Sequence, residues 1–150
     1  MTQISRSSRV RSEKPQNVPQ SVGEPDLLVV DATWGEVQPL EPVPGLPAVG
    51  ELELIALVEA GALLVDTRVP DSRSGVTLVG AINIPHDEIS DRRSELGSGL
   101  SVLFCNGPQC PQTPDALRTL TGSGFPASQL RYYRGGLHDW MTLGYPTQSV

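Results

Sequence analysis

The stretch that decides the fold is Leu100–Ala116, which reads LSVLFCNGPQCPQTPDA. Its first five residues have the composition of a short buried strand, and Cys105 follows them directly. A loop with Gly and Pro comes next, and Thr113 followed by Pro114 predicts a helix that is capped by Thr113. The segment therefore predicts a strand, a loop and a helix, with a thiol at the carboxyl end of the strand.

The same alternation of strands and helices continues on both sides of this segment. Short apolar runs predict further strands at 63–66, 81–84 and 130–133. Helical spacing of apolar residues, with glycines near the ends, predicts helices at 51–60, 86–96, 113–121 and 136–143. Strands that alternate with helices predict an α/β domain with a mainly parallel sheet.

The length of 150 residues fits one domain and little more. Residues 1–25 are rich in Ser, Gln and Arg, and we interpret them as a disordered tail. Residues 26–47 form a Pro-rich arm or connector, in which the apolar run 27–30 is either a short strand or an arm packed on the domain. We expect the compact domain at 48–150.

Charge and composition exclude several classes of protein. Residues 1–22 carry a net charge of +3, whereas the remainder, with 7 basic and 16 acidic residues, carries −9. An acidic body argues against nucleic acid as the main partner. No window approaches the roughly 18 apolar residues of a membrane helix, and the start lacks the apolar core of a secretory signal. We therefore expect a cytoplasmic protein that has no membrane partner.

The position of Cys105 predicts a nucleophile. Ligands bind at the carboxyl edge of open α/β sheets, where loop amides and a helix amino terminus favour a thiolate. The thiolate is the reactive form of cysteine. The alternative is that Cys105 is a small buried hydrophobic residue at a strand end.

A second thiol, Cys110, lies in the same loop and leaves three interpretations open. It is a plain loop residue beside the thiolate, a resolving thiol that forms a disulfide with Cys105, or a metal ligand. We predict no metal site and no cofactor. A Cys-dependent phosphatase is excluded because Pro111 stands where its phosphate-clamping Arg would be, and 105–117 contains no Lys or Arg.

Taken together, these motifs resemble those of a rhodanese-type sulfurtransferase domain. The resemblance covers about residues 48–147 and depends on four stretches in the right order. They are Leu63–Arg68 (LLVDTR), Gly80–Pro85 (GAINIP), Phe104–Cys105 with its loop, and Arg134–Pro146 (RGGLHDWMTLGYP).

The resemblance implies a rhodanese-like three-layer domain, with a mainly parallel sheet of about five strands flanked by helices. It also implies that Cys105 carries a persulfide, and that the loop around it binds the substrate. The residues of that loop are Asn106, Gly107, Pro108, Gln109 and Cys110. Expected partners are a small sulfur-donor anion such as thiosulfate, or a persulfide, together with a thiol acceptor that is a small molecule or a protein.

Three further residues are expected to support the site. Asp66 and Arg68 follow a strand, either as a structural pair or at the mouth of the site, and Arg134 approaches the loop from the next strand end. The sequence departs from the resemblance because Thr77 replaces a usual His, the loop is about two residues longer, and it lacks a basic residue. An alternative function is therefore a non-catalytic binding module, or a thiol redox sensor that uses both cysteines.

Overall fold

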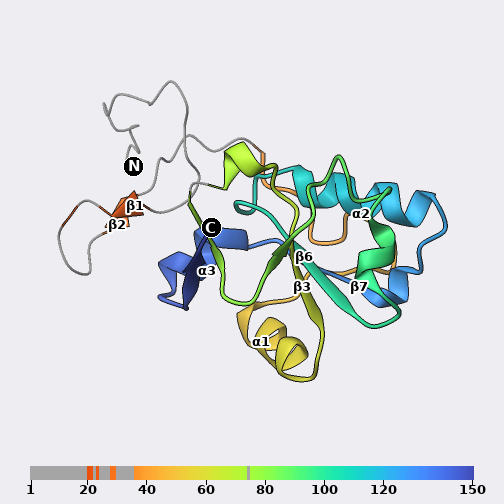
Figure 1. The fold of residues 1–150 in the computed structure, drawn as a ribbon, viewed down its shortest axis with the longest axis horizontal. Coiled ribbons are helices and arrows are strands. Elements are labelled where there is room, and N and C mark those ends of the chain that lie inside the picture. Colours follow the sequence, from red (N-terminus) through yellow and green to blue (C-terminus); the bar gives the residue numbers. More distant parts are fainter. Residues whose placement is uncertain (1–19, 22, 24–27, 30–35, 74) are drawn as a thin grey trace, which may run out of the picture.

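The computed structural model describes residues 20–21, 23, 28–29, 36–73 and 75–150 (Figure 1). Most of the predicted tail, 1–25, lies outside the described residues. Within the apolar run 27–30, the strand β2 (Leu28–Val29) pairs antiparallel with β1 (Gln20–Ser21).

A parallel sheet forms the centre of the domain, with the strand order β5-β3-β6-β7 (Figure 1). Its strands are β3 (Leu63–Asp66), β5 (Ile82–Asn83), β6 (Ser101–Phe104) and β7 (Leu130–Tyr133). The register pairs Asp66 with Phe104, and Phe104 with Tyr133. Because all four strands run the same way, the residues that follow them meet at one edge of the sheet. The α/β class predicted from the sequence is confirmed.

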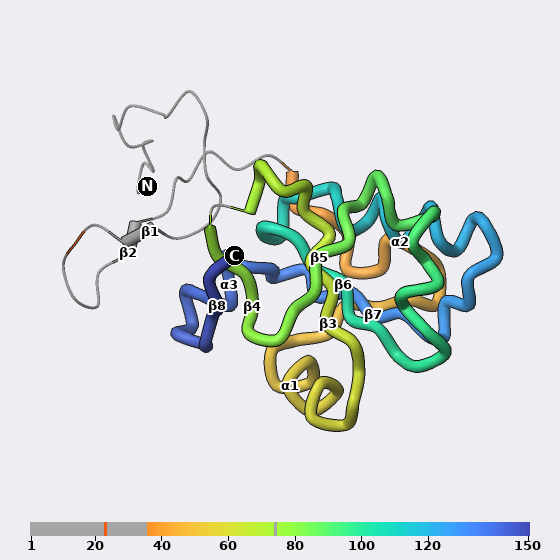
Figure 2. The backbone as a smooth tube through the Cα atoms, viewed as in Figure 1, coloured from red at the N-terminus to blue at the C-terminus, as the bar shows by residue number. Residues whose placement is uncertain are grey.

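The described part of the sheet has four strands rather than about five. A fifth position is reduced to one parallel bridge between Ala48 and Tyr132, where the Val49 amide donates to the Tyr132 carbonyl at 2.8 Å. This segment stays short because Pro47 has no N–H to donate and helix α1 begins at Glu51. Two other strands, β4 (Val76–Leu78) and β8 (Thr147–Ser149), pair antiparallel beside the sheet (Figure 2).

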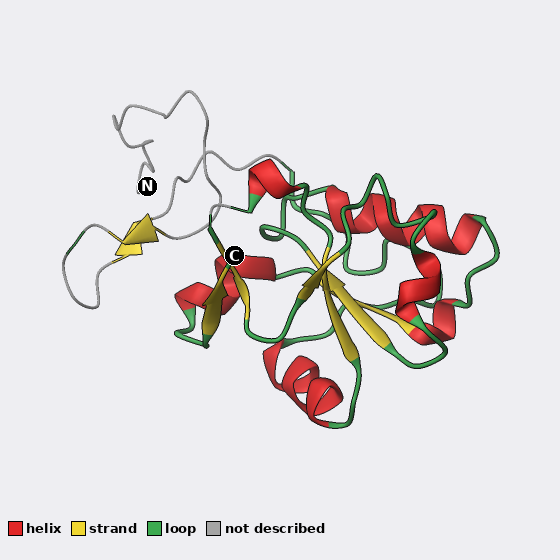
Figure 3. Ribbon diagram, viewed as in Figure 1, coloured by secondary structure: helices red, strands yellow, loops and turns green. Residues whose placement is uncertain are grey.

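Helices cover both faces of the sheet and divide the core into two clusters (Figure 3). Helices α1 (Glu51–Glu59) and α3 (Gly136–Thr142) pack on one face, around Phe104 and Trp140. Helix α2 (Gln112–Gly122) packs on the other face, around Leu103 and Leu117. This alternation along β6 buries both faces of the strand, as expected for a central parallel strand.

One helix prediction and one cap prediction are wrong. Residues 86–96 form turns and a single 3₁₀ turn, η2 (Arg93–Leu96), with three-residue bonds such as that from the Glu95 amide to the Arg92 carbonyl at 3.0 Å. Helix α2 begins at Gln112, so Thr113 lies inside it and does not cap it. The Thr113 hydroxyl is instead buried against the hydroxyl of Thr67 at 2.8 Å.

Part of the Pro-rich segment lies against the domain. Leu46 is fully buried with the cluster under α2, and the amide of Gln38 donates to the Pro108 carbonyl at 2.7 Å. Two other short 3₁₀ turns, η1 (Pro70–Ser72) and η3 (Ala127–Gln129), complete the connections.

Candidate active site

Cys105 directly follows the last residue of β6, at the carboxyl edge of the sheet. Its side chain is buried, and its Sγ donates to the carbonyl of Cys110 at 3.5 Å. The loop between them is curled by a turn in which the Cys110 amide donates to the Gly107 carbonyl at 3.0 Å. Both thiols are free, so the loop encloses two unoxidised cysteines.

The first turn of helix α3 holds this loop in place. The amide of Leu137 donates to the Cys105 carbonyl at 3.1 Å, and the amide of His138 donates to the Asn106 carbonyl at 2.8 Å. The C=O and N–H of a trans peptide point in opposite directions, so these bonds turn the amides of Asn106 and Gly107 away from α3. The helix thereby orients loop donors toward the thiols.

The loop amides and the neighbouring thiol favour a thiolate on Cys110. The pKa of Cys110 is lowered to about 7, first because it accepts a hydrogen bond from the Cys105 thiol. Burial opposes this shift, whereas backbone amides of Gln112 and Asn106 and the positive charge of Arg68 add to it. Cys110 is therefore the thiol whose ionisation the loop favours.

Cys105 shows the opposite behaviour. Burial raises its pKa well above the ordinary value, and its interaction with Cys110 raises it further. The hydroxyl and amide of Thr113 act against this rise but are weaker. The sequence predicts the thiolate on Cys105, whereas in the structure the pKa of Cys105 is raised and that of Cys110 is lowered, so the two thiols titrate as a coupled pair.

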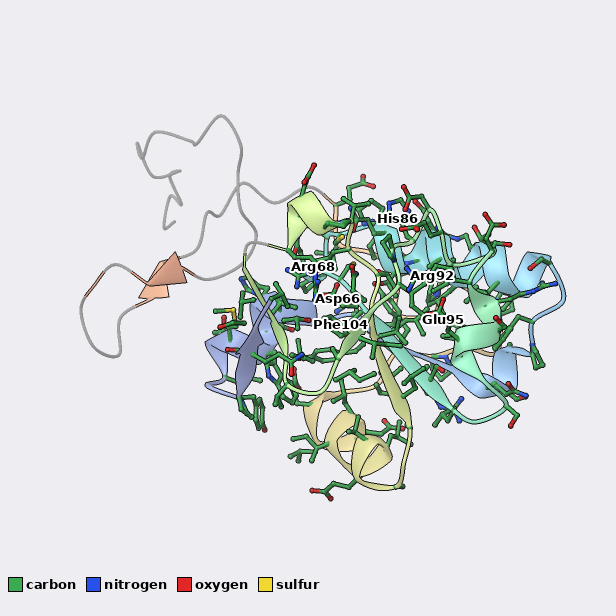
Figure 4. All side chains as sticks on the ribbon, viewed as in Figure 1. Asp66, Arg68, His86, Arg92, Glu95 and Phe104 are labelled. Carbon is green, nitrogen blue, oxygen red and sulfur yellow. The ribbon has the colours of Figure 1, made fainter. Side chains whose placement is uncertain are left out.

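Asp66 and Arg68 form a buried ion pair beside the loop, with Arg68 Nη2 2.7 Å from Asp66 Oδ2 (Figure 4). Arg68 also donates to the Asn106 side chain at 3.1 Å and to the Val76 carbonyl at 2.6 Å. Thr77 donates to Asp66 at 2.8 Å. The pair therefore ties the segment after β3 to strand β4 and to the loop of Cys105, and its cation also acts on Cys110.

Two further residues predicted for the site, Arg134 and Gln109, are linked through Gln38. Arg134 donates to the Gln38 carbonyl at 3.0 Å, and the Gln38 side chain donates to the Gln109 carbonyl at 3.3 Å. Arg134 thus reaches the loop through Gln38. Both side-chain polar atoms of Gln109 are buried without a hydrogen-bond partner.

The sequence interpretation missed Tyr132 and Thr67. Tyr132 is fully buried, its hydroxyl has no hydrogen-bond partner, and burial and both thiols raise its pKa. It pairs with Leu103, so the two-residue period of a strand places it on the same face as Cys105. The alternation of side chains along the strand could therefore have identified Tyr132 from the sequence. The hydrogen bond between Thr67 and Thr113 of α2 could not be predicted, because no sequence pattern indicates it.

The described residues contain no group of three or more His, Cys, Asp or Glu side chains that is placed to hold a metal ion. His86 lies on a turn beside β3, and His138 is paired with Asp139 at 2.9 Å. In the same part of the chain, no helix has the length and apolar character needed to cross a membrane.

The structure is a parallel α/β domain with a buried thiol at the end of a central strand. The loop after that strand is held by the Gly-Gly start of helix α3. The family model of the rhodanese-like domain matches residues 52–143. The chain therefore belongs to the rhodanese-like domain family.

Solved structures agree with this assignment. A rhodanese-like domain from Anabaena is 24% identical with a TM-score of 0.54, covering 66% of this chain and 76% of that one. A thiosulfate sulfurtransferase from Pseudomonas aeruginosa is 22% identical with a TM-score of 0.56, covering 69% of this chain and 20% of that one. At these identities the likeness shows the fold.

One relative of this chain is named as a transcriptional regulator. It is an HTH-type transcriptional regulator of Mycobacterium tuberculosis, 36% identical over 104 residues, which are 68% of this chain. The chain spans 45% of the length of that relative. The relative therefore resembles this chain through part of its own length.

Proposed function

We propose that this domain is a sulfurtransferase that moves a sulfane sulfur through a persulfide on Cys105. The observation that carries the proposal is the contact between the Sγ of Cys105, at the end of β6, and the Cys110 carbonyl at 3.5 Å, within a loop held by α3. The lowered pKa of the Cys110 thiol supports it. Membership of the rhodanese-like family supports it.

In the first step, the sulfur of Cys105 attacks the outer sulfur of the donor while its proton passes to the Cys110 thiolate. With thiosulfate as donor, the S–S bond of thiosulfate breaks, sulfite leaves with the bonding electron pair, and Cys105 becomes a persulfide. Cys110 thus acts as the base for a thiol that burial otherwise keeps protonated.

In the second step, an acceptor thiolate attacks the outer sulfur of the persulfide. The bond between the two sulfurs breaks, the acceptor becomes a persulfide, and the electron pair returns to Cys105. The amides of Asn106 and Gln112 are directed at the loop interior, where negative charge resides on sulfur through both steps.

A second candidate is a binding or thiol-sensing module without sulfur transfer. Two observations favour it: the relative that is a transcriptional regulator, and the pair of buried thiols. In that case the reversible event is a disulfide formed after oxidation of one thiol, and no sulfur passes to an acceptor.

The experiment is sulfur transfer from thiosulfate or inorganic polysulfide to a small thiol, compared between the wild type and Cys105→Ser. The proposal expects transfer by the wild type and its loss in Cys105→Ser. A wild type that transfers no sulfur from either donor, yet forms a disulfide with mild peroxide, would support the sensing module instead.

A further inference from the structure

We infer that Cys110 attacks the loaded Cys105 and releases its outer sulfur as sulfide, which gives the domain a sulfide-releasing activity. This inference rests on the proposed function, because it needs a persulfide on Cys105. It names Cys110 as the resolving thiol among the three interpretations that the sequence left open.

Burial is the first argument. Cys105 is 2% exposed and Cys110 is 8% exposed, so an external thiol reaches the persulfide only after the loop opens. Cys110 needs no such opening, because the Sγ of Cys105 already lies 3.5 Å from the carbonyl of Cys110 inside the same curled loop. The intramolecular attack therefore competes with transfer to an outside acceptor.

The second argument is that the donors to Cys110 do not depend on a free Cys105. The Gln112 amide begins helix α2, and the Asn106 amide is oriented by the bond from Leu137 to the Cys105 carbonyl of the same peptide. Arg68 is fixed by its ion pair with Asp66. These groups continue to stabilise a thiolate on Cys110 after Cys105 has taken up sulfur.

The step balances without an oxidant. Cys110 first passes to solvent the proton that it took from Cys105. Its thiolate then attacks the inner sulfur of the Cys105 persulfide, the bond to the outer sulfur breaks, and HS⁻ leaves with the electron pair. The product is a disulfide between Cys105 and Cys110. The persulfide is reduced to sulfide while the two cysteines are oxidised, and a dithiol reductant restores both thiols for the next cycle.

The test uses inorganic polysulfide or thiosulfate with the full chain and no added thiol. The wild type should release about one equivalent of sulfide and finish as the disulfide, seen by peptide mapping. Cys110→Ser and Cys110→Ala lack the base, so they are incubated with the donor until Cys105 is loaded. Per loaded Cys105 they should then release at least about tenfold less sulfide and keep the added sulfur. Two different replacements separate loss of the thiol from a local folding defect.

The outcomes separate this inference from the proposed function. If the wild type keeps a stable persulfide and Cys110 remains free to alkylation, the inference is wrong and sulfur transfer stands. If the wild type and the Cys110 variants all take up no sulfur, the proposed function itself fails.

Discussion

The backbone amide of Leu137 donates a hydrogen bond to the carbonyl of Cys105 at 3.1 Å, which joins helix α3 to the peptide that follows the candidate nucleophile. Gly136 makes this approach possible. It has φ +59°, and a Cβ there would overlap the Cys105 carbonyl oxygen and lie 2.8 Å from the amide nitrogen of Gly107. Glycine at 136 is therefore required by the close approach of the loop.

We predict that Gly136→Ala lowers the free energy of unfolding by at least about 2 kcal/mol and abolishes sulfur uptake, because the loop must move. Gly144→Ala is a matched control. Gly144 also has a positive φ, +78°, but an added Cβ meets nothing within 4 Å, so only about 1 kcal/mol of backbone strain is expected. Urea unfolding checks both values, and equal losses with uptake intact would contradict the clamp.

The thiolate on Cys110 should titrate near neutral pH. Ultraviolet absorbance of the wild type should show one thiolate forming with a midpoint at about pH 7. In Cys105→Ala the midpoint should rise, because the largest cause of the lowered pKa is the hydrogen bond from Cys105. A wild-type midpoint at the ordinary value of about 8.5 would refute the thiol–thiolate pair.

The same lowered pKa gives a pH dependence of stability. A thiol whose pKa is lower in the folded state stabilises the fold fully above its unfolded pKa, about 8.5, and this contribution is lost as the pH falls through about 7. Cys110→Ser should remove the change between these two pH values. Unfolding free energies that rise equally in both proteins would show another group to be responsible.

The buried ion pair should be costly to break from one side. Arg68→Met leaves the buried Asp66 carboxylate with only Arg73, whose Nε lies 3.4 Å away, and we expect a loss of about 3 kcal/mol of stability. The double change Asp66→Asn with Arg68→Met should lose less than the sum of the two single changes, because the carboxylate that Arg68 paired is then gone. Chemical unfolding of the wild type, both single variants and the double variant tests this, and additive losses would rule out the coupling.

The loop itself offers no basic side chain to a thiosulfate anion, so thiosulfate should be used poorly. Gln109→Arg should improve its apparent affinity by on the order of 1 to 2 kcal/mol, since an Arg bonds such an anion directly. Steady-state kinetics with thiosulfate and with polysulfide measure this. Efficient wild-type use of thiosulfate that the substitution leaves unchanged would contradict the argument.

Sequence patterns identified the elements that local rules control. The apolar runs around Val65 and Leu103 became β3 and β6, because a central parallel strand has to be apolar on both faces. The predicted helix at 86–96 did not form, and its first amide, that of His86, makes a contact with Thr67 that lies far away in the chain. Local periodicity carries no information about such a contact.

The candidate site also has features that the sequence predicts and features that it does not. Cys105, Cys110 and Arg68 were found because their residue types and positions after strands are visible in the sequence. The lowered pKa of Cys110 could not be predicted, because it depends on where the amides of Asn106 and Gln112 point, and these directions are set by α3 and by the start of α2. Gln38 and Tyr132 join the site only through the folded arrangement.

The most direct test of the central claim is to locate the transferred sulfur. Cys110→Ser is treated with inorganic polysulfide, its persulfides are alkylated, and its peptides are mapped by mass spectrometry beside those of Cys105→Ser. The account predicts one added sulfur on the thiol of Cys105 in Cys110→Ser, and no added sulfur in Cys105→Ser. Sulfur bound by Cys105→Ser, with none on Cys105 in Cys110→Ser, would contradict it.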